Sequence, residues 1–176
     1  KVKYVLTNFT LNLLKKANIQ GDYIITPPRI ELSFLNSQQT KISHDFLQLL
    51  SVGRLVAHKG HTVLIEAVKQ IPSSIPWKLT IAGTGPEYTK LTTKINMLSL
   101  SKQITIKENL SQNQILNEYK QATIFIFPSL EQKNGVEGFG IVLLEAMALQ
   151  ILIIASNTGG IPEVLGSKCG LLIPPD

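Results

Sequence analysis

The stretch EQKNGVEGFGIVLLEAMAL, residues 131–149, decides the fold, because a polar, glycine-marked loop leads here into an apolar helix. Glu137 and Glu145 lie eight positions apart (145 − 137). We expect Glu137 where the loop turns into the helix and Glu145 about two turns along it, roughly 80° apart around the axis, so that both can edge one cleft. Glu145 stands among apolar residues, where a carboxylate without a partner is costly.

The backbone before this helix favours an anionic ligand. Gly138, Phe139 and Gly140 are predicted to place N–H groups at the helix start, where the first donors lack helical partners and the helix dipole is positive. A plainer interpretation also fits: Glu137 favours the dipole, and Glu145 is solvated. The apolar surroundings of Glu145 shift the balance toward a bound partner.

Apolar strands alternate with helices on both sides of this stretch. The strands are nearly all apolar (LQLLSV, IFIF, ILIIA), which indicates a parallel sheet covered on both faces. Right-handed crossovers then give an α/β, doubly wound, Rossmann-like fold. Strands are predicted at 46–52, 77–82, 104–106, 123–127, 151–155 and 170–173, and helices at 60–71, 86–98, 111–122, 139–149 and 161–165.

Smaller signals refine this outline. Ser111 and Gln114 predict a capping box. The helix over 60–71 is expected to turn Leu64, Ala67 and Val68 inward. Nearer the start, strands are predicted at 2–6 and 23–26 around a helix that Asn8 or Thr10 caps, and residues 29–45 are polar and aperiodic, which is typical of a linker.

The loop after the first strand of the sheet, residues 53–60, reads GRLVAHKG. Ligands of doubly wound folds bind beyond the carboxyl ends of the strands, so this loop faces the predicted site. Arg54 offers a planar fork for phosphate oxygens, and Lys59 adds a point charge before a helix start. Two cations here imply a diphosphate. Judged by position alone, Arg54 and Lys59 could equally be exposed loop charges without a ligand.

Several other classes of site are excluded. The chain has no P-loop, no dinucleotide fingerprint after its first strand and no nucleophile elbow. His44, His58 and His61 lie in or beside loops, where we expect solvated side chains, and no cluster has metal-ligand spacing. The glycines at 159 and 160 can either face a ligand or form a plain turn.

Charge and composition bound the partners. The net charge of +5 comes from scattered lysines, without the basic run that indicates nucleic acid. The chain has one cysteine and no signal peptide or 18-residue apolar run, so we expect a cytoplasmic protein, with peripheral association at a membrane face. It begins without Met and ends on Pro-Pro-Asp, and we expect it to be a piece of a longer protein.

Six motifs resemble one family when they are taken in order. They are VGRL-x3-KG, AG-x-GP, FPS, EGFGIVLLEAMA, GGIPEV and GLLIPPD, and they resemble the nucleotide-sugar domain of glycosyltransferase family 4, also called group 1. The resemblance covers about residues 2–176 and implies the two-domain GT-B architecture. It places the end of the N-terminal acceptor domain at 1–28, a linker at 29–45, and the donor-binding domain, truncated before its last helices, at 46–176.

The resemblance also implies roles. Arg54 and Lys59 would bind the donor diphosphate and stabilise it as it leaves, and Glu137 would touch the sugar hydroxyls, so these three are the expected catalytic residues. Glu145 would accept hydrogen bonds from the ribose hydroxyls. The backbone amides that would line the sugar and phosphate are those of Gly138, Phe139, Gly140 and Ile141. The family retains anomeric configuration and generally needs no metal or other cofactor, and the acceptor would come from the N-terminal domain.

The chain departs from the family pattern at three places, the first of which is the linker, where Pro28-Arg29 replaces the usual Asn-Gly turn. Gly and Pro usually stand near Gln150 and Leu152, so the helix end here lacks an easy left-handed cap. A Gly usually stands within residues 108–110, near the base. The resemblance leads to a retaining glycosyltransferase of polysaccharide or glycolipid biosynthesis. Two alternatives stay open: a degenerate nucleotide-sugar-binding module without transfer activity, and a GT-B nucleotide-sugar hydrolase or epimerase.

Overall fold

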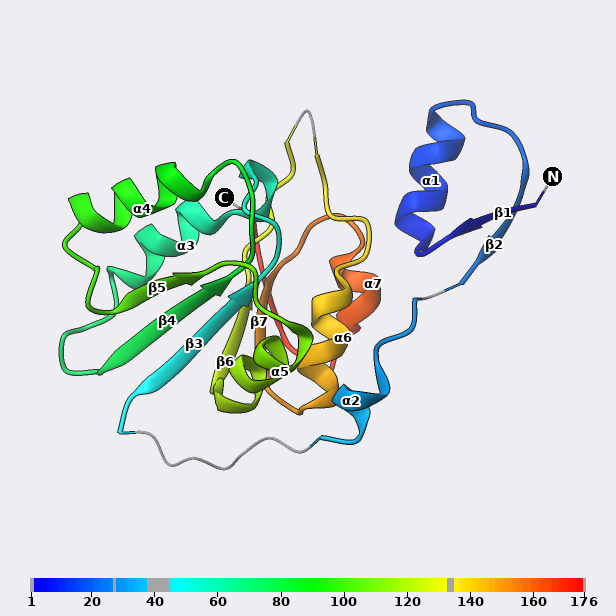
Figure 1. Ribbon diagram of the computed structural model, residues 1–176. Helices are drawn as coiled ribbons and strands as arrows, with labels where there is room; N and C mark the ends of the chain where they lie inside the picture. Colours follow the sequence, from blue (N-terminus) through cyan, green and yellow to red (C-terminus); the bar gives the residue numbers. More distant parts are fainter. Residues whose placement is uncertain (1, 27, 38–44, 133–134, 176) are drawn as a thin grey trace.

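A six-stranded, wholly parallel sheet forms the centre of the molecule (Figure 1). The computed structural model describes residues 2–26, 28–37, 45–132 and 135–175. The strand order is β5-β4-β3-β6-β7-β8, which confirms the doubly wound, Rossmann-like prediction and reverses direction between β3 and β6. The strands are β3 (Leu47–Val52), β4 (Trp77–Ala82), β5 (Ile104–Lys107), β6 (Ile124–Phe127), β7 (Leu152–Ser156) and β8 (Leu171–Ile173).

Helices cover both faces of the sheet because the strand side chains alternate between two apolar clusters. In β3, Leu49 packs with α3 and α4, whereas Leu50 packs with α5, α6 and α7 on the opposite face. Each face therefore has its own core. The helices are α3 (His61–Val68), α4 (Tyr88–Met97), α5 (Gln112–Gln121), α6 (Ile141–Ala148) and α7 (Ile161–Leu165), and the 3-10 turn η1 spans Ala57–Lys59.

Local signals fix some elements better than others. Ser111 and Gln114 form the predicted capping box at the start of α5. The helix predicted over 60–71 is shorter, and it turns Ile65 rather than Ala67 into the core, because Ala67 is exposed. A hydrophobic residue such as Ile65 gains more from that burial than alanine does.

A small parallel β-α-β unit precedes the sheet and lies to its right in Figure 1. It consists of β1 (Val2–Val5), α1 (Asn8–Lys16) and β2 (Asp22–Ile25). Thr7 caps α1, where Asn8 or Thr10 was expected, because its hydroxyl accepts the Thr10 amide proton. The Glu163 carboxylate of α7 accepts the amide protons of Asn8, at 2.8 Å, and Phe9, and so attaches this unit to the rest of the chain.

The range predicted as linker contains an additional element. The short helix α2 (Leu32–Leu35) lies within residues 29–45 and buries Phe34 in the core beneath α5 and α6. The sequence analysis did not predict this helix, because a single large apolar residue can anchor a segment without any periodicity. Residues 38–44, His44 among them, lie outside the described part of the chain. The division into domains stays a prediction.

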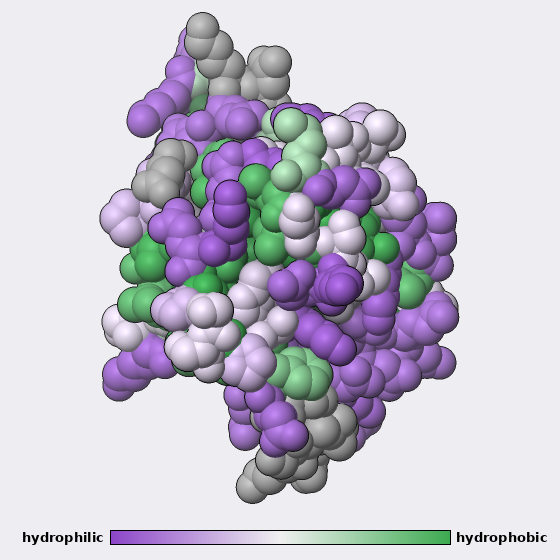
Figure 2. All heavy atoms as spheres, turned by 90° about the vertical axis from the view of Figure 1, so that its left-hand side faces the viewer, coloured by the Kyte–Doolittle hydropathy of each residue, from purple (hydrophilic) through white to green (hydrophobic). Residues whose placement is uncertain are grey.

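The side of the molecule with α4 and the edge strand β5 is shown in Figure 2. Hydrophilic residues cover much of it around a hydrophobic central area. Lys107 at this sheet edge pairs with Glu118 at 2.7 Å, and charges of this kind discourage an edge strand from pairing with another chain. Within the described ranges, no helix is long and apolar enough to cross a membrane.

Candidate active site

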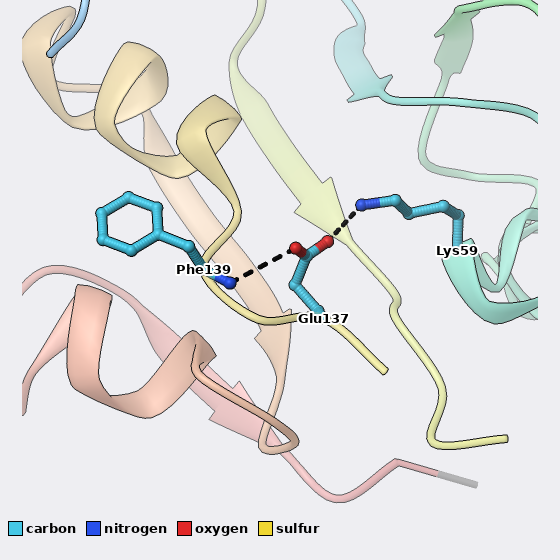
Figure 3. Close-up of polar contacts among 3 residues, drawn as sticks. All are labelled: Lys59, Glu137 and Phe139. Atoms are coloured by element: carbon cyan, nitrogen blue, oxygen red, sulfur yellow. Dashed lines mark hydrogen bonds and ion pairs between the residues drawn. The ribbon is translucent and has the colours of Figure 1, made fainter. Parts of the chain in front are cut away.

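An ion pair joins the loops that follow β3 and β6. The Lys59 ammonium contacts Oε2 of Glu137 (Figure 3), and the two side chains are only 13% and 12% exposed. The Lys59 Nζ also lies 4.9 Å from the centroid of the Phe127 ring, within the range of a cation–π interaction. This ion pair brings together two of the expected site residues, which lie 78 positions apart in sequence.

Backbone contacts hold these two loops together. Gly60 has a φ of 69°, and a Cβ on it would lie 1.8 Å from the carbonyl oxygen of Pro128. No other residue fits there, because any side chain would collide with fixed backbone. The amide of Leu130 also donates to the carbonyl of His58 at 2.7 Å. Lys59 therefore stands between two points at which its loop touches the loop after β6.

The segment that carries Glu137 rests on the turn after β7. The Gly160 amide donates to the carbonyl oxygen of Glu137 at 2.8 Å. A Cβ on Gly159 would lie 2.1 Å from that oxygen, and a Cβ on Gly160 would lie 2.1 Å from the carbonyl oxygen of Gly138. Thr7 donates its hydroxyl to the same Gly138 oxygen at 2.9 Å. The sequence left the two glycines as ligand contacts or as a turn; here they support the Glu137 backbone.

Helix α6 begins later than predicted. It starts at Ile141 rather than at residue 139, with Gly140 as N-cap at a φ of 81°. Glu137 is therefore not on the helix, and the angle of roughly 80° between the two glutamates does not apply. Gly138 and Phe139 lie in the preceding loop, and the Phe139 amide points to Oε1 of Glu137 at 3.4 Å (Figure 3).

Arg54 lines a cavity at the carboxyl ends of β3, β4 and β5. The cavity has a volume of about 320 Å³, near the lower end of the range for small-molecule sites. At its edge the backbones after β3 and β4 approach closely, because a Cβ on Gly83 would lie 1.8 Å from the Gly53 carbonyl oxygen. Asn109, in the loop that departs from the family pattern, has a φ of 54° and also lines the cavity.

The buried partner of Glu145 is a tyrosine that the sequence analysis missed. Tyr119 in α5 donates its hydroxyl to Oε2 of Glu145 at 2.8 Å, and the tyrosine side chain is 0% exposed. Burial raises the pKa of Glu145, and the hydrogen bond from Tyr119 acts against that rise. A buried hydroxyl needs an acceptor. The position of Tyr119 three residues after Leu116, on the inward face of the helix, was the sequence signal that could have indicated this contact.

His58 and His61 differ from their predicted solvated state. His61 is 2% exposed at the start of α3, and burial, with a smaller contribution from Lys59, lowers its pKa to about 4. His58 is half-buried, and burial followed by the charge of Lys59 lowers its pKa as well. His61 is buried because it begins a helix that packs on the sheet. Among the described residues, no group of three or more His, Cys, Asp or Glu side chains could hold a metal ion.

Comparison with known proteins decides the family. The sequence model described as "Glycosyl transferases group 1" matches residues 34–176. The chain belongs to the glycosyl transferases of group 1. It is 30% identical over 158 residues to the protein WcaL of Salmonella typhimurium, covering 84% of this chain and 39% of WcaL. It is 32% identical over 143 residues to the amylovoran biosynthesis glycosyltransferase AmsK of Erwinia amylovora, covering 80% of this chain and 35% of AmsK.

Solved structures place this group 1 chain in the GT-B fold. It superposes on WaaG, a glycosyltransferase involved in lipopolysaccharide biosynthesis, with a TM-score of 0.82 at 21% identity, covering 97% of this chain and 48% of WaaG. It superposes on HepE of Anabaena, solved with UDP and glucose, with a TM-score of 0.81 at 18% identity, covering 98% of this chain and 49% of HepE. The group 1 chain thus spans about half the length of these proteins, and less than half of its curated relatives.

Proposed function

We propose that this chain is the donor-binding half of a retaining glycosyltransferase, which binds a nucleoside-diphosphate sugar and supports transfer of the sugar to an acceptor hydroxyl. Membership of the group 1 family supports sugar transfer in general. The observation that carries the finer proposal is the pairing of Lys59 with Glu137 where the strand order reverses. Ligands of doubly wound sheets bind at this point.

In this proposal the two cations act on the diphosphate. Arg54 lines the cavity beside β3, and Lys59 lies at the other end of the same loop. When the bond between the anomeric carbon and the diphosphate oxygen breaks, negative charge grows on the leaving group. Cations placed beside the leaving group stabilise that charge as it develops. The protein then needs neither a metal ion nor another cofactor.

The acids orient the rest of the donor. Glu137 accepts hydrogen bonds from the sugar hydroxyls, and the amides of Gly138, Phe139, Gly140 and Ile141 line the sugar and phosphate. Glu145 accepts hydrogen bonds from the ribose hydroxyls. The acceptor hydroxyl forms its new bond on the face of the sugar that the diphosphate leaves, and its proton passes to the departing diphosphate oxygen. The acceptor is held by an N-terminal domain that extends beyond residues 2–26, on a full-length protein that associates peripherally with a membrane from the cytoplasm.

Donor binding can be tested on the 176-residue chain. Saturation-transfer NMR against a panel of nucleotide-sugars should identify the donor, and calorimetric titration should then show weaker binding by Arg54→Ala. Arg29→Ala is the matched control, because Arg29 is the only other arginine and is exposed. Equal affinities for the two variants would refute the assignment of Arg54.

Transfer separates this proposal from its two alternatives. The longer protein, given the identified donor and a set of acceptors, should form a glycoside with the anomeric configuration of the donor. A degenerate binding module would bind the donor and form no glycoside. A hydrolase or epimerase would instead yield free sugar or an epimer without any acceptor. Because catalysis requires the acceptor to be positioned across the cleft, we expect the 176-residue chain to bind donor weakly and to transfer nothing.

A further inference from the structure

We propose that Tyr119 is a positioning residue for the donor nucleoside: its hydroxyl holds one carboxylate oxygen of Glu145, so that the other oxygen is fixed for the ribose. This inference rests on the proposed function, because it assumes that a nucleoside diphosphate binds beside α6. It assigns a part in donor binding to a residue in the buried core, which the expected set of site residues did not include.

Two acceptors on α6 lie within hydrogen-bonding distance of the Tyr119 hydroxyl. The Tyr119 Oη lies 2.8 Å from Oε2 of Glu145 and 3.3 Å from the carbonyl oxygen of Val142. A phenol has one proton to donate, and the shorter contact to a carboxylate is the stronger hydrogen bond. The second contact comes from the same helix, one turn before Glu145. Tyr119 therefore connects α5 to two points on α6.

Aromatic packing keeps the ring of Tyr119 in place. The ring stacks on Phe125 of β6, with centroids 5.4 Å apart, and meets Phe34 of α2 edge-on at 5.5 Å. Tyr119, Phe34 and Phe125 are each 1% exposed or less. A ring so enclosed has no alternative rotamer, so its hydroxyl occupies a fixed position. The buried Phe34 gives α2 a part in positioning this ring.

The two carboxylate oxygens of Glu145 differ in their surroundings. Oε2 accepts the hydrogen bond from Tyr119. Within the described part of the chain, Oε1 accepts no hydrogen bond and keeps some contact with solvent. One oxygen is thus held from the core while the other remains available to accept hydrogen bonds from the hydroxyl groups of a ligand.

The pKa shifts of Tyr119 and Glu145 agree with a tyrosine that donates and a carboxylate that accepts. Burial, and then the negative charge of Glu145, raise the pKa of Tyr119 well above its ordinary value, so the phenol keeps its proton. The pKa of Glu145 is raised by burial and by the charge of Glu31, and the Tyr119 hydrogen bond acts in the opposite direction. Removing the hydroxyl should therefore make Glu145 harder to ionise and less able to accept from ribose.

The test compares Tyr119→Phe with Tyr88→Phe, which removes a partly exposed tyrosine hydroxyl from α4 on the other face of the sheet. UDP and GDP are the probes, each beside its 2′,3′-dideoxy analogue. We expect Tyr119→Phe to bind the better probe about tenfold more weakly, the size of one lost hydrogen bond, and the dideoxy analogue with almost unchanged affinity. The acid limb of the binding profile should also move to higher pH.

Two further measurements distinguish failure of this inference from failure of the proposed function. If Glu145→Gln weakens binding and Tyr119→Phe leaves both affinity and pH profile unchanged, the inference is wrong and the donor site stands. If neither Glu145→Gln nor removal of the ribose hydroxyls changes affinity, the ribose role itself is wrong. In the unaltered chain, carbon-13 NMR should show the pKa of Glu145 falling when UDP or GDP binds. If the pKa of Glu145 stays the same when the nucleotide binds, the inference is wrong. This measurement does not require Tyr119→Phe to fold.

Discussion

Lys59 and Glu137 neutralise each other between the loops after β3 and β6, at the point where the strand order of the sheet reverses. This pair brings together two residues that are 78 positions apart in sequence. An anionic ligand at this place would compete with Glu137 for Lys59. The pair is thus a structural contact that we expect to change when a donor binds.

Replacing Lys59 should therefore affect binding and stability together. We expect Lys59→Met to weaken diphosphate binding at least tenfold, and to lower the free energy of unfolding by about 1–3 kcal/mol because a partly buried Glu137 loses its partner. Titration calorimetry and urea denaturation measure the two effects.

Lys94→Met is the matched control for that prediction. Lys94 pairs with Glu66 between α4 and α3, and the side chain of Glu66 is 57% exposed. Exposed pairs contribute little, so this variant should change stability by less than about 1 kcal/mol and leave binding unaltered. Equal effects of the two variants would contradict the role given to Lys59.

The glycine turn after β7 offers a second comparison. Gly159 and Gly166 have φ values of 60° and 58°, so an alanine is strained at either position. Only at Gly159 does the new Cβ meet a neighbour, the Glu137 carbonyl oxygen at 2.1 Å, whereas nothing lies within 4 Å at Gly166.

We expect Gly166→Ala to lose about 1–3 kcal/mol of stability from backbone strain and Gly159→Ala to lose more, because its Cβ also collides with backbone, and we expect Gly159→Ala alone to weaken nucleotide-sugar binding by displacing Glu137. Thermal denaturation and donor titration, at a temperature where both variants are folded, provide the measurements. Weakened binding in Gly166→Ala of the same size would show that general strain, and not the position of Glu137, causes the loss.

The sequence predicted the sheet well because its signals are local. Nearly all-apolar strands, the capping box at Ser111 and the turn glycines each act over a few residues, and together they determine a doubly wound fold. The helix start at α6 was misplaced because Gly140 adopts a left-handed conformation against the Phe127 ring. That contact depends on the packing of β6, which no local pattern records.

The candidate site was predictable in part for the same reason. Lys59 and Glu137 follow strands, so topology alone brings them to one edge of the sheet. Tyr119 and His61 were not predictable in this way, because their state depends on burial. A tyrosine on a helix face does not reveal which carboxylate it meets, and a histidine beside a loop does not reveal that the loop is covered.

The burial of His61 predicts a specific loss of stability in acid. Its pKa is 6.5 in the unfolded chain and about 4 in the folded chain. Above pH 6.5 neither state binds the proton. As the pH falls from 6.5 toward 4, only the unfolded chain becomes protonated, so the free energy of unfolding should drop by up to about 3 kcal/mol.

Urea denaturation across this pH range measures the loss, with His61→Phe as the test variant. His61→Phe should flatten the profile between pH 6.5 and 4, since the buried ring no longer titrates. His58→Gln is the comparison, because His58 is only half-buried, and most of the slope should remain. A His61→Phe profile as steep as that of the unaltered chain would assign the slope to other groups.

The turn after α6 carries a strain that one substitution should relieve. Gln150 has a φ of 57° and is exposed, and it stands where the family usually has a glycine near the helix end. A side chain in the left-handed region costs about 1 kcal/mol or more, while glycine adopts it freely but loses more entropy on folding. The first effect is the larger, so Gln150→Gly should raise the free energy of unfolding by about 0.5–1 kcal/mol. The urea midpoint should rise with an unchanged slope.

Asn117→Gly, at an exposed position inside α5, should instead lower stability, because glycine there only costs entropy. If both variants lowered stability, the prediction would be wrong. The side-chain amide of Gln150 would then make a contact that stabilises the fold by more than the left-handed backbone costs.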